Sequence, residues 1–272
     1  NAVFENLIVT DNTSVAGSGI SIWRVSGPTL SNLIIQDNTS EHYGGGLMIF
    51  SANASVTDVI VTGNDCYRND SYGGGMIINN SEATLTNVTV TDNTASNGGG
   101  IFILDTDATL INLTVSGNTA TAFGGGLLVG ANTNPTLTNS IIWGNNPNQI
   151  QGFGTPTITY SDIQGGWNGV GNIDSDPLFC NSDSGDFTLT ENSPCVGTGE
   201  SGANMGAFGI GCEPVLSIDE NLILESFALH QNYPNPFNPV TTLQYDLPED
   251  ALVNITIYDM MGRQVKTLVN GS

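Results

Sequence analysis

Hydrophobic and polar positions follow a short pattern that the chain repeats six times. Each copy runs from an apolar residue, through Asn or Asp, to a β-branched stretch and a closing Asn. The copies begin at Phe4, Leu30, Val56, Leu85, Leu110 and Leu137, with spacings of 25–29 residues. A repeat of this length is typical of units that bury their core only against their neighbours, so the pattern predicts a solenoid.

The aligned copies form columns that place each position inside or outside. One column is apolar and β-branched throughout: Val9, Ile35, Val61, Val90, Val115 and Ile142. Because alternate side chains of a strand point to opposite faces, this column should point inward and the columns on either side of it outward. Three residues later stands a column of asparagines: Asn12, Asn38, Asn64, Asn93, Asn118 and Asn145. Stacked asparagines can form amide ladders, and we interpret these six as a structural ladder.

Two further strands complete each repeat. One follows a glycine run at residues 44–46, 73–75, 98–100 and 124–126, and the other leads into the next copy. The glycine runs lack the following helix and lysine that a phosphate-binding loop requires. Three short strands and three corners in each coil predict a parallel β-helix.

These glycine and asparagine patterns resemble the repeats of right-handed parallel β-helix proteins, which include pectate-lyase-like enzymes and many bacterial surface proteins. The resemblance covers roughly residues 1–210 and implies an all-β solenoid. We expect regular coils at 1–154 and a last coil with a C-terminal cap at 155–212. The fold itself does not specify an activity.

The charge balance narrows the choice of partners. The chain has 26 acidic residues and four basic ones, which gives a formal net charge of −22. This excess of negative charge disfavours nucleic acids and anionic membranes as partners. No apolar run approaches the roughly 18 residues of a membrane span.

Three of the four cysteines lie in the predicted cap. One disulfide among Cys180, Cys195 and Cys212 is expected in an oxidising compartment, and we favour Cys195–Cys212, although the spacing leaves the pairing open. Cys66, in the long third repeat, is expected to be unpaired.

Calcium is the one cofactor that the sequence suggests. Four carboxylates gather in the irregular cap: Asp174, Asp176, Asp183 and Asp186. Calcium prefers several oxygen ligands, which makes these residues the candidate metal site, with solvated turn acids as the alternative.

The tail has its own signature. Residues 213–228 are interpreted as a linker and 229–272 as a partial C-terminal β-sandwich. A proline-rich motif consists of Tyr233, Pro234, Asn235, Pro236, Phe237, Asn238 and Pro239, and the sequence YDMMGR follows at 258–263. Both resemble the C-terminal sorting domain of the type IX secretion system, which implies contact with the secretion machinery and a secreted or outer-surface location in a Bacteroidetes-like bacterium.

Both ends of the chain suggest a longer parent protein. Asn1 already lies inside a repeat, without the atypical first coil that would cap a solenoid. Sorting domains of this kind normally continue with further strands, whereas this chain stops at Ser272. We therefore expect sequence beyond both ends.

Candidate chemistry is sparse. The repeats contain only Arg24 and Arg68 as basic residues, with no aligned carboxylate cluster, so we assign no catalytic residue. Seven aromatic residues could stack on sugars if they gathered on one side: Trp23, Tyr43, Tyr67, Tyr72, Phe102, Phe123 and Trp143. Four outward threonines, Thr62, Thr89, Thr91 and Thr114, suggest a flat ice-binding face. Their columns are interrupted by Gln36, Ile60 and Trp143, which disfavours this interpretation.

The sequence therefore favours a non-enzymatic, adhesin-like or glycan-binding β-helix scaffold exported by type IX secretion, with a polysaccharide or cell-surface glycan as its partner. The alternative is a polysaccharide lyase or glycoside hydrolase whose site lies partly outside this chain.

Overall fold

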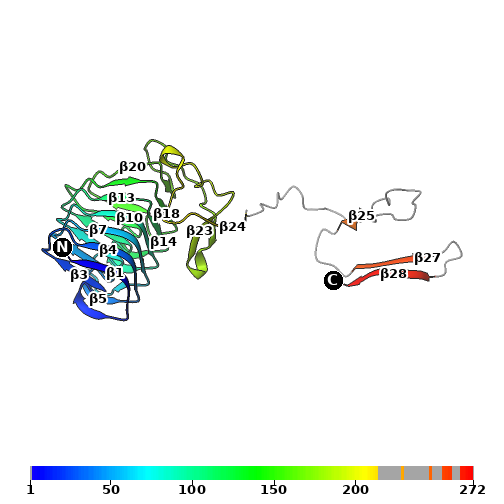
Figure 1. The fold of residues 1–272 in the computed structure, drawn as a ribbon, viewed down its shortest axis with the longest axis horizontal. Helices are drawn as coiled ribbons and strands as arrows, with labels where there is room; N and C mark the ends of the chain where they lie inside the picture. Colours follow the sequence, from blue (N-terminus) through cyan, green and yellow to red (C-terminus); the bar gives the residue numbers. More distant parts are fainter. Residues whose placement is uncertain (1, 214–227, 230–244, 247–252, 259–263, 272) are drawn as a thin grey trace. The chain divides into compact units, whose positions relative to one another are not determined.

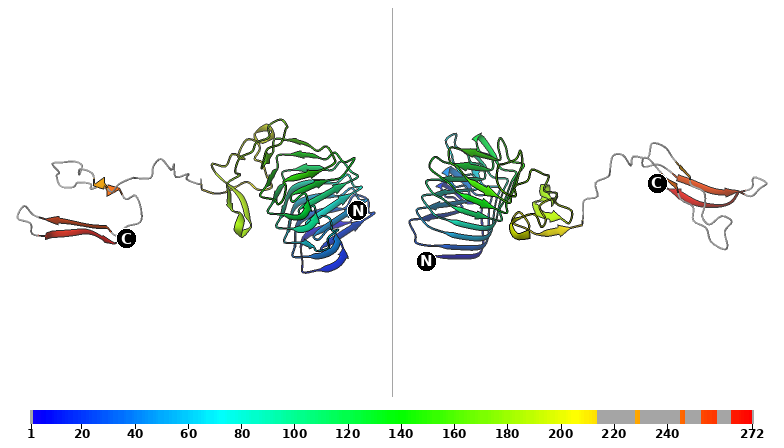
Figure 2. Two further views of the ribbon diagram at one scale, coloured as in Figure 1. Left: turned by 180° about the vertical axis from the view of Figure 1, so that it is seen from behind. Right: turned by 90° about the horizontal axis from the view of Figure 1, so that it is seen from above.

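The computed structural model describes residues 2–213, 228–229, 245–246, 253–258 and 264–271. The chain divides into two compact units, Asn1–Val215 and Leu216–Ser272. The first unit is a right-handed parallel β-solenoid with three sheets and a C-terminal cap (Figures 1 and 2). The predicted fold class is thus confirmed.

Each coil contributes strands to three parallel sheets. Sheet A contains β1 (Val3–Thr10), β4 (Thr29–Gln36), β7 (Ser55–Thr62), β10 (Thr84–Thr91), β13 (Thr109–Ile111), β14 (Thr114–Ser116), β17 (Thr136–Thr138), β18 (Ile141–Trp143), β20 (Thr157–Thr159) and β21 (Asp162–Ile163). Sheet B contains β2 (Thr13–Ala16), β5 (Thr39–Tyr43), β8 (Asp65–Cys66), β11 (Thr94–Asn97) and β15 (Thr119–Phe123). Sheet C contains β3 (Ile20–Trp23), β6 (Leu47–Phe50), β9 (Met76–Asn79), β12 (Ile101–Leu104), β16 (Leu127–Val129) and β19 (Ile150–Gly152).

The solenoid core consists of stacked inward columns. In sheet A the register joins Leu30 to Val56 and Val56 to Leu85, and all three are fully buried. Leu47 and Met76 pair in the same way in sheet C and are also fully buried. Because every coil places an apolar side chain on the one before it, the hydrophobic core is continuous along the axis.

The glycine runs allow the coils to approach closely at the corner between sheets B and C. A Cβ atom on Gly74 would lie 2.3 Å from the carbonyl oxygen of Thr94 and 2.5 Å from that of Gly99. Both atoms belong to the backbone of the next coil, so no side chain at position 74 could be accommodated by a rotamer change. The run therefore has a structural explanation.

The asparagine column forms a hydrogen-bonded ladder. Asn64 Nδ2 donates to Asn93 Oδ1 at 2.9 Å, and Asn93 Nδ2 donates to Asn118 Oδ1 at the same distance. The backbone N–H of each donor residue also donates to the next asparagine oxygen. Gln149 ends the ladder by accepting from Asn145 Nδ2 at 2.8 Å. The amides thus satisfy buried polar groups that would otherwise lack partners.

The cap returns along the side of the solenoid. Its elements are β22 (Phe179–Asn181), η1 (Ser182–Ser184), β23 (Asp186–Thr190), η2 (Glu200–Gly202) and β24 (Ile210–Cys212). Figure 1 shows β23 and β24 beside β14 and β18 of sheet A. The Ala207 N–H donates to Thr114 Oγ1 at 3.0 Å, and the Gly206 N–H donates to the Asn139 carbonyl at 2.8 Å.

This packing alters the predicted outward columns. Thr89, Thr91 and Thr114 do point away from the core, but they are no more than 2 % exposed. The cap covers this part of sheet A, with Met205 in a buried cluster beside Ile141. These threonines therefore form an internal interface, whereas their sequence pattern suggested a free surface.

The predicted disulfide Cys195–Cys212 is wrong. The bond joins Cys180 to Cys212, whose Cα atoms lie 6.0 Å apart, a normal separation for a disulfide. Cys195 is a free thiol because its side chain is turned into the buried cluster with Ile141 and Leu189. Cys66 is also free, as expected, and its side chain is buried.

The second unit contains two antiparallel strand pairs within its described residues. They are β25 (Ala228–Leu229) with β26 (Tyr245–Asp246), and β27 (Val253–Tyr258) with β28 (Gln264–Gly271). The proline-rich motif at 233–239 lies outside the described residues. In the part of the chain that the structure describes, no helix has the length and apolar character to cross a membrane.

Candidate functional site

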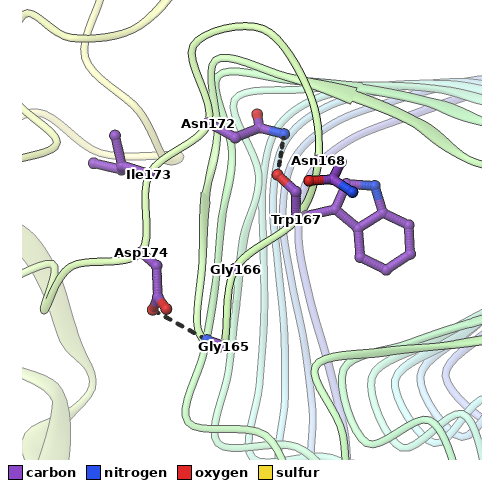
Figure 3. A pocket seen from close by; sticks show the side chains of 7 residues that line it. All are labelled: Gly165, Gly166, Trp167, Asn168, Asn172, Ile173 and Asp174. Atoms are coloured by element: carbon purple, nitrogen blue, oxygen red, sulfur yellow. Dashed lines mark hydrogen bonds between the residues drawn. The ribbon is translucent and has the colours of Figure 1, made fainter.

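A hollow of about 690 Å³ lies at the end of the solenoid, and we call it the end hollow. Its lining consists of Gly165, Gly166, Trp167, Asn168, Asn172, Ile173 and Asp174 (Figure 3). Asn172 Nδ2 donates to the Trp167 carbonyl at 3.2 Å, and Asp174 accepts from the Gly165 N–H at 3.0 Å. Trp167 also packs against the solenoid core, so this loop serves to close the last coil.

The structure does not bring the four predicted calcium ligands into one site. Asp174 borders the end hollow, whereas Asp176 and Asp183 line a different cavity. Asp186 accepts from the backbone N–H of Thr188 at 3.0 Å. Among the described residues, no group of three or more His, Cys, Asp or Glu side chains is arranged to hold a metal ion.

A lateral cleft of about 850 Å³ separates sheet A from the β22–β23 hairpin. Asp92 and Trp143 border the cleft on the side of sheet A, and Asp176 and Asp183 border it on the side of the cap. Burial raises the pKa of the Asp92 carboxyl above its usual value. Carboxylates on both sides of a cleft are the groups that glycoside hydrolysis uses. Sequence reasoning missed this convergence because the cap residues are remote from Asp92 along the chain.

The third cavity is an aromatic groove of about 420 Å³ over the outer face of sheet C. Its floor consists of Met48, Ile77 and Phe102, which come from β6, β9 and β12 and stack in register. These three side chains are 5–7 % exposed, although they point away from the solenoid core. A second, smaller apolar cluster thus lies on the outside of the sheet.

Two aromatic walls flank this floor. Trp23 and Phe50 pair in register on one side, with ring centroids 4.6 Å apart and planes inclined by 21°. Tyr43 and Tyr72 stand on the other side, with centroids 6.1 Å apart and planes inclined by 13°. Each pair comes from successive coils, so the walls run along the solenoid axis.

The groove is open to solvent at both walls. Trp23 is 52 % exposed and Tyr43 is 44 % exposed. The Arg24 guanidinium lies 5.9 Å from the centre of the Trp23 ring, which places a cation–π contact at one edge. Asn79 contributes a polar side chain to the lining. The groove is therefore apolar in its interior and polar only at a few points.

Four of the seven aromatic residues singled out in the sequence gather in this groove: Trp23, Tyr43, Tyr72 and Phe102. Trp143 lies in the lateral cleft instead, and Tyr67 and Phe123 are exposed outside the groove lining. Sequence reasoning missed Phe50. Alignment of the residues after each glycine run would have placed Phe50 in the same column as Trp23.

Comparisons with known proteins are informative for both units. The family model described as "Right handed beta helix region" matches residues 1–142, and the model described as "Secretion system C-terminal sorting domain" matches residues 231–271. No curated protein and no solved structure matches the chain significantly. The sorting domain indicates type IX secretion to the cell surface or the extracellular space and implies contact with the secretion machinery. The chain therefore belongs to the right-handed β-helix family and carries a C-terminal sorting domain of the type IX secretion system.

Proposed function

We propose that this secreted β-helix protein is an adhesin-like scaffold that binds a neutral glycan in the aromatic groove of sheet C. One observation carries the proposal: aromatic side chains from successive coils form both walls of a single open groove. The core columns, the glycine corners and the asparagine ladder of the repeat have structural roles.

Sugar rings and aromatic rings are complementary because each pyranose has an apolar face of C–H groups. Aromatic side chains supply large apolar area at a fixed position, and tyrosine adds a polar tip that can hydrogen-bond to hydroxyls. The Tyr72 ring stacks on Phe102 as well as on Tyr43, at centroid distances of 5.1 and 6.1 Å, whereas Tyr43 at the end of this row is 44 % exposed. Ring surface is therefore left for a ligand.

The net charge selects among glycans. At −22 the chain repels uronate and sulfate polymers at long range. Arg68, one of the two basic residues of the solenoid, is paired with Glu41 at 2.9 Å. An uncharged chain lying along the solenoid axis, across successive coils, fits both walls of the groove.

A polysaccharide panel tests this proposal. Neutral and uronate-containing polymers would be incubated with the full chain, and both binding and release of products would be measured. We expect binding of a neutral polymer, with Trp23→Ala and Tyr72→Ala each weakening it by about fivefold or more, since an aromatic contact contributes about 1 kcal/mol. Phe123→Ala is the matched control, because Phe123 is equally aromatic and 54 % exposed but lies outside the groove lining.

A glycoside hydrolase is the second candidate function, and the lateral cleft favours it. Asp92 faces Asp176 and Asp183 there, beside Trp143. The same panel distinguishes the two functions. Release of reducing ends that is lost in Asp92→Asn would overturn the proposal of a binding protein, and so would a preference for uronate polymers.

A further inference from the structure

Sheet A carries a second regular surface that the proposed function does not use. Two outward columns flank the buried Leu30 column, one on either side of it. The first is Thr29, Ser55, Thr84, Thr109, Thr136 and Thr157, and the second is Ser31, Thr57, Thr86, Ile111, Thr138 and Thr159. We call these positions the hydroxyl array. Eleven of the twelve are Ser or Thr, in six consecutive coils without a gap in register.

The hydroxyl groups of the array are free to bind something outside the protein. All of its residues are described, and Thr138 with Thr159, at 3.3 Å, is the one hydrogen-bonded pair that their side chains make. Ser55, Thr84, Thr136 and Thr157 are exposed, and the remaining members are half-buried between neighbouring strands. The cap does not cover them, in contrast to Thr89 and Thr114 on the same sheet.

The array is uncharged in a strongly acidic protein. Charged side chains stay at its borders: Glu5 pairs with Ser31 in the coil before the array, Glu82 and Asp107 lie before the first column, and Asp58 follows the second. Charged groups hold hydration shells of their own, whereas a threonine presents one hydroxyl and one methyl group. β-Branching also fixes the threonine rotamer, so the groups repeat as regularly as the backbone does.

The spacing of the array is that of a lattice. Coils repeat about every 4.8 Å along the axis, and alternate residues of a strand lie about 6.7 Å apart. A single exposed hydroxyl gains little from exchanging one water partner for another. Eleven hydroxyls together can contribute a substantial binding free energy only if the partner surface has hydrogen-bonding groups that are fixed in place. Those groups must also repeat with the same periods as the array.

We propose that the hydroxyl array binds ice. Crystalline water is an uncharged lattice of fixed donors and acceptors, and the array offers it matching donors, acceptors and methyl groups on one face. The array contains no aromatic side chain, which disfavours a sugar polymer as its ligand. Gln36, Ile60 and Trp143, which interrupt the outward threonines discussed in the sequence, belong to two other columns of sheet A. The cap covers part of those two columns.

Ice recrystallisation measured with the full chain tests this proposal. The wild-type protein should keep ice grains small, and Thr84→Tyr combined with Thr109→Tyr should abolish the effect, because two bulky rings in the middle of the array would lift it off the surface. Thr94→Tyr is the matched control, since Thr94 is an exposed threonine of sheet B outside the array. Circular dichroism and thermal melting would establish that all variants are folded.

The outcomes separate clearly. Activity of the wild type and of Thr94→Tyr, with loss in the double variant, supports the proposal. A wild-type protein without effect on ice would overturn it, and so would a folded double variant that is as active as the wild type. Binding of the wild type to an insoluble polysaccharide that the double variant loses, without any effect on ice, would also overturn it. Trp23→Ala should retain full activity on ice, which keeps this test independent of the aromatic groove.

Discussion

At the scale of single residues, Asp162 combines complete burial with an ionisable side chain. It pairs with Ile141 in sheet A, points outward, and is sealed beneath the cap with 0 % exposure. Its carboxylate accepts hydrogen bonds from the Cys195 thiol at 3.1 Å and the Ser175 N–H at 3.2 Å. Burial outweighs these bonds and raises the pKa of Asp162 to about 6 from 3.8.

This pKa predicts a pH dependence that Asp162→Asn should remove. The folded-state pKa is raised, so the protonated carboxyl stabilises the fold fully below about pH 3.8, and this stability is lost as pH rises through about 6. Asp162→Asn should therefore be more stable than the wild type at pH 7.5, by on the order of 2–3 kcal/mol. The difference should shrink as pH falls from 6 to 4.

Thermal or urea unfolding of both proteins across this pH range measures the effect. Comparison of the two proteins at each pH cancels the acid effects that they share. A variant that is less stable than the wild type at pH 7.5, or a difference that does not change with pH, contradicts the assignment.

Residues differ in how far the sequence reveals their role. The asparagines of the ladder recur at fixed spacing, so their structural role could be predicted. Nothing in the sequence around Asp162 marks it as buried, because what buries it is a cap segment more than thirty residues further along the chain. The disulfide partner of Cys212 was missed for the same reason, since the direction of the Cys195 side chain is set by tertiary packing.

At the scale of elements, the asparagine ladder connects the coils. Asn93 accepts from both the backbone and the side chain of Asn64, and it donates to Val61 and Asn118. Asn93→Ala would leave the buried backbone N–H of Asn64 without its acceptor and would remove three further side-chain bonds, to Asn64, Val61 and Asn118. We expect it to destabilise the fold by roughly 3–5 kcal/mol in urea unfolding.

Asn12→Ala provides the control within the same column. Asn12 makes the same bond to Asn38, at 2.9 Å, but is exposed in the first coil, where water can replace the lost partner. Its loss should cost about 1 kcal/mol or less. If the two substitutions destabilise the protein equally, burial is not what gives the ladder its importance.

The strands of the solenoid could be predicted because their columns have a period of two residues and a repeat of 25–29 residues. The sequence could not predict which outward columns remain uncovered by the cap. The cap covers Thr114 and Ile141 and leaves the Thr29 column open. The cap residues that lie on them, such as Met205 and Ala207, are far along the chain, so the columns themselves do not indicate which of them is covered.

At the scale of the whole molecule, the two units have separate roles. The sorting domain directs the protein out of the cell, and the solenoid presents its surfaces there. The aromatic groove lies over sheet C, while the lateral cleft and the hydroxyl array belong to sheet A. A regular core thus supports several independent surfaces, and the sequence repeat by itself does not indicate which of them is used.

The central claim is that a neutral glycan binds in the aromatic groove, and tryptophan fluorescence tests it most directly. The chain has three tryptophans, one in each of the aromatic groove, the lateral cleft and the end hollow: Trp23, Trp143 and Trp167. Variants that keep one of them, with phenylalanine at the other two positions, would be titrated with the neutral polymer that the panel identifies. We predict a saturable blue shift in the variant that keeps Trp23 and none in the other two. A shift confined to the variant that keeps Trp143 would contradict the account and place the ligand in the acidic lateral cleft.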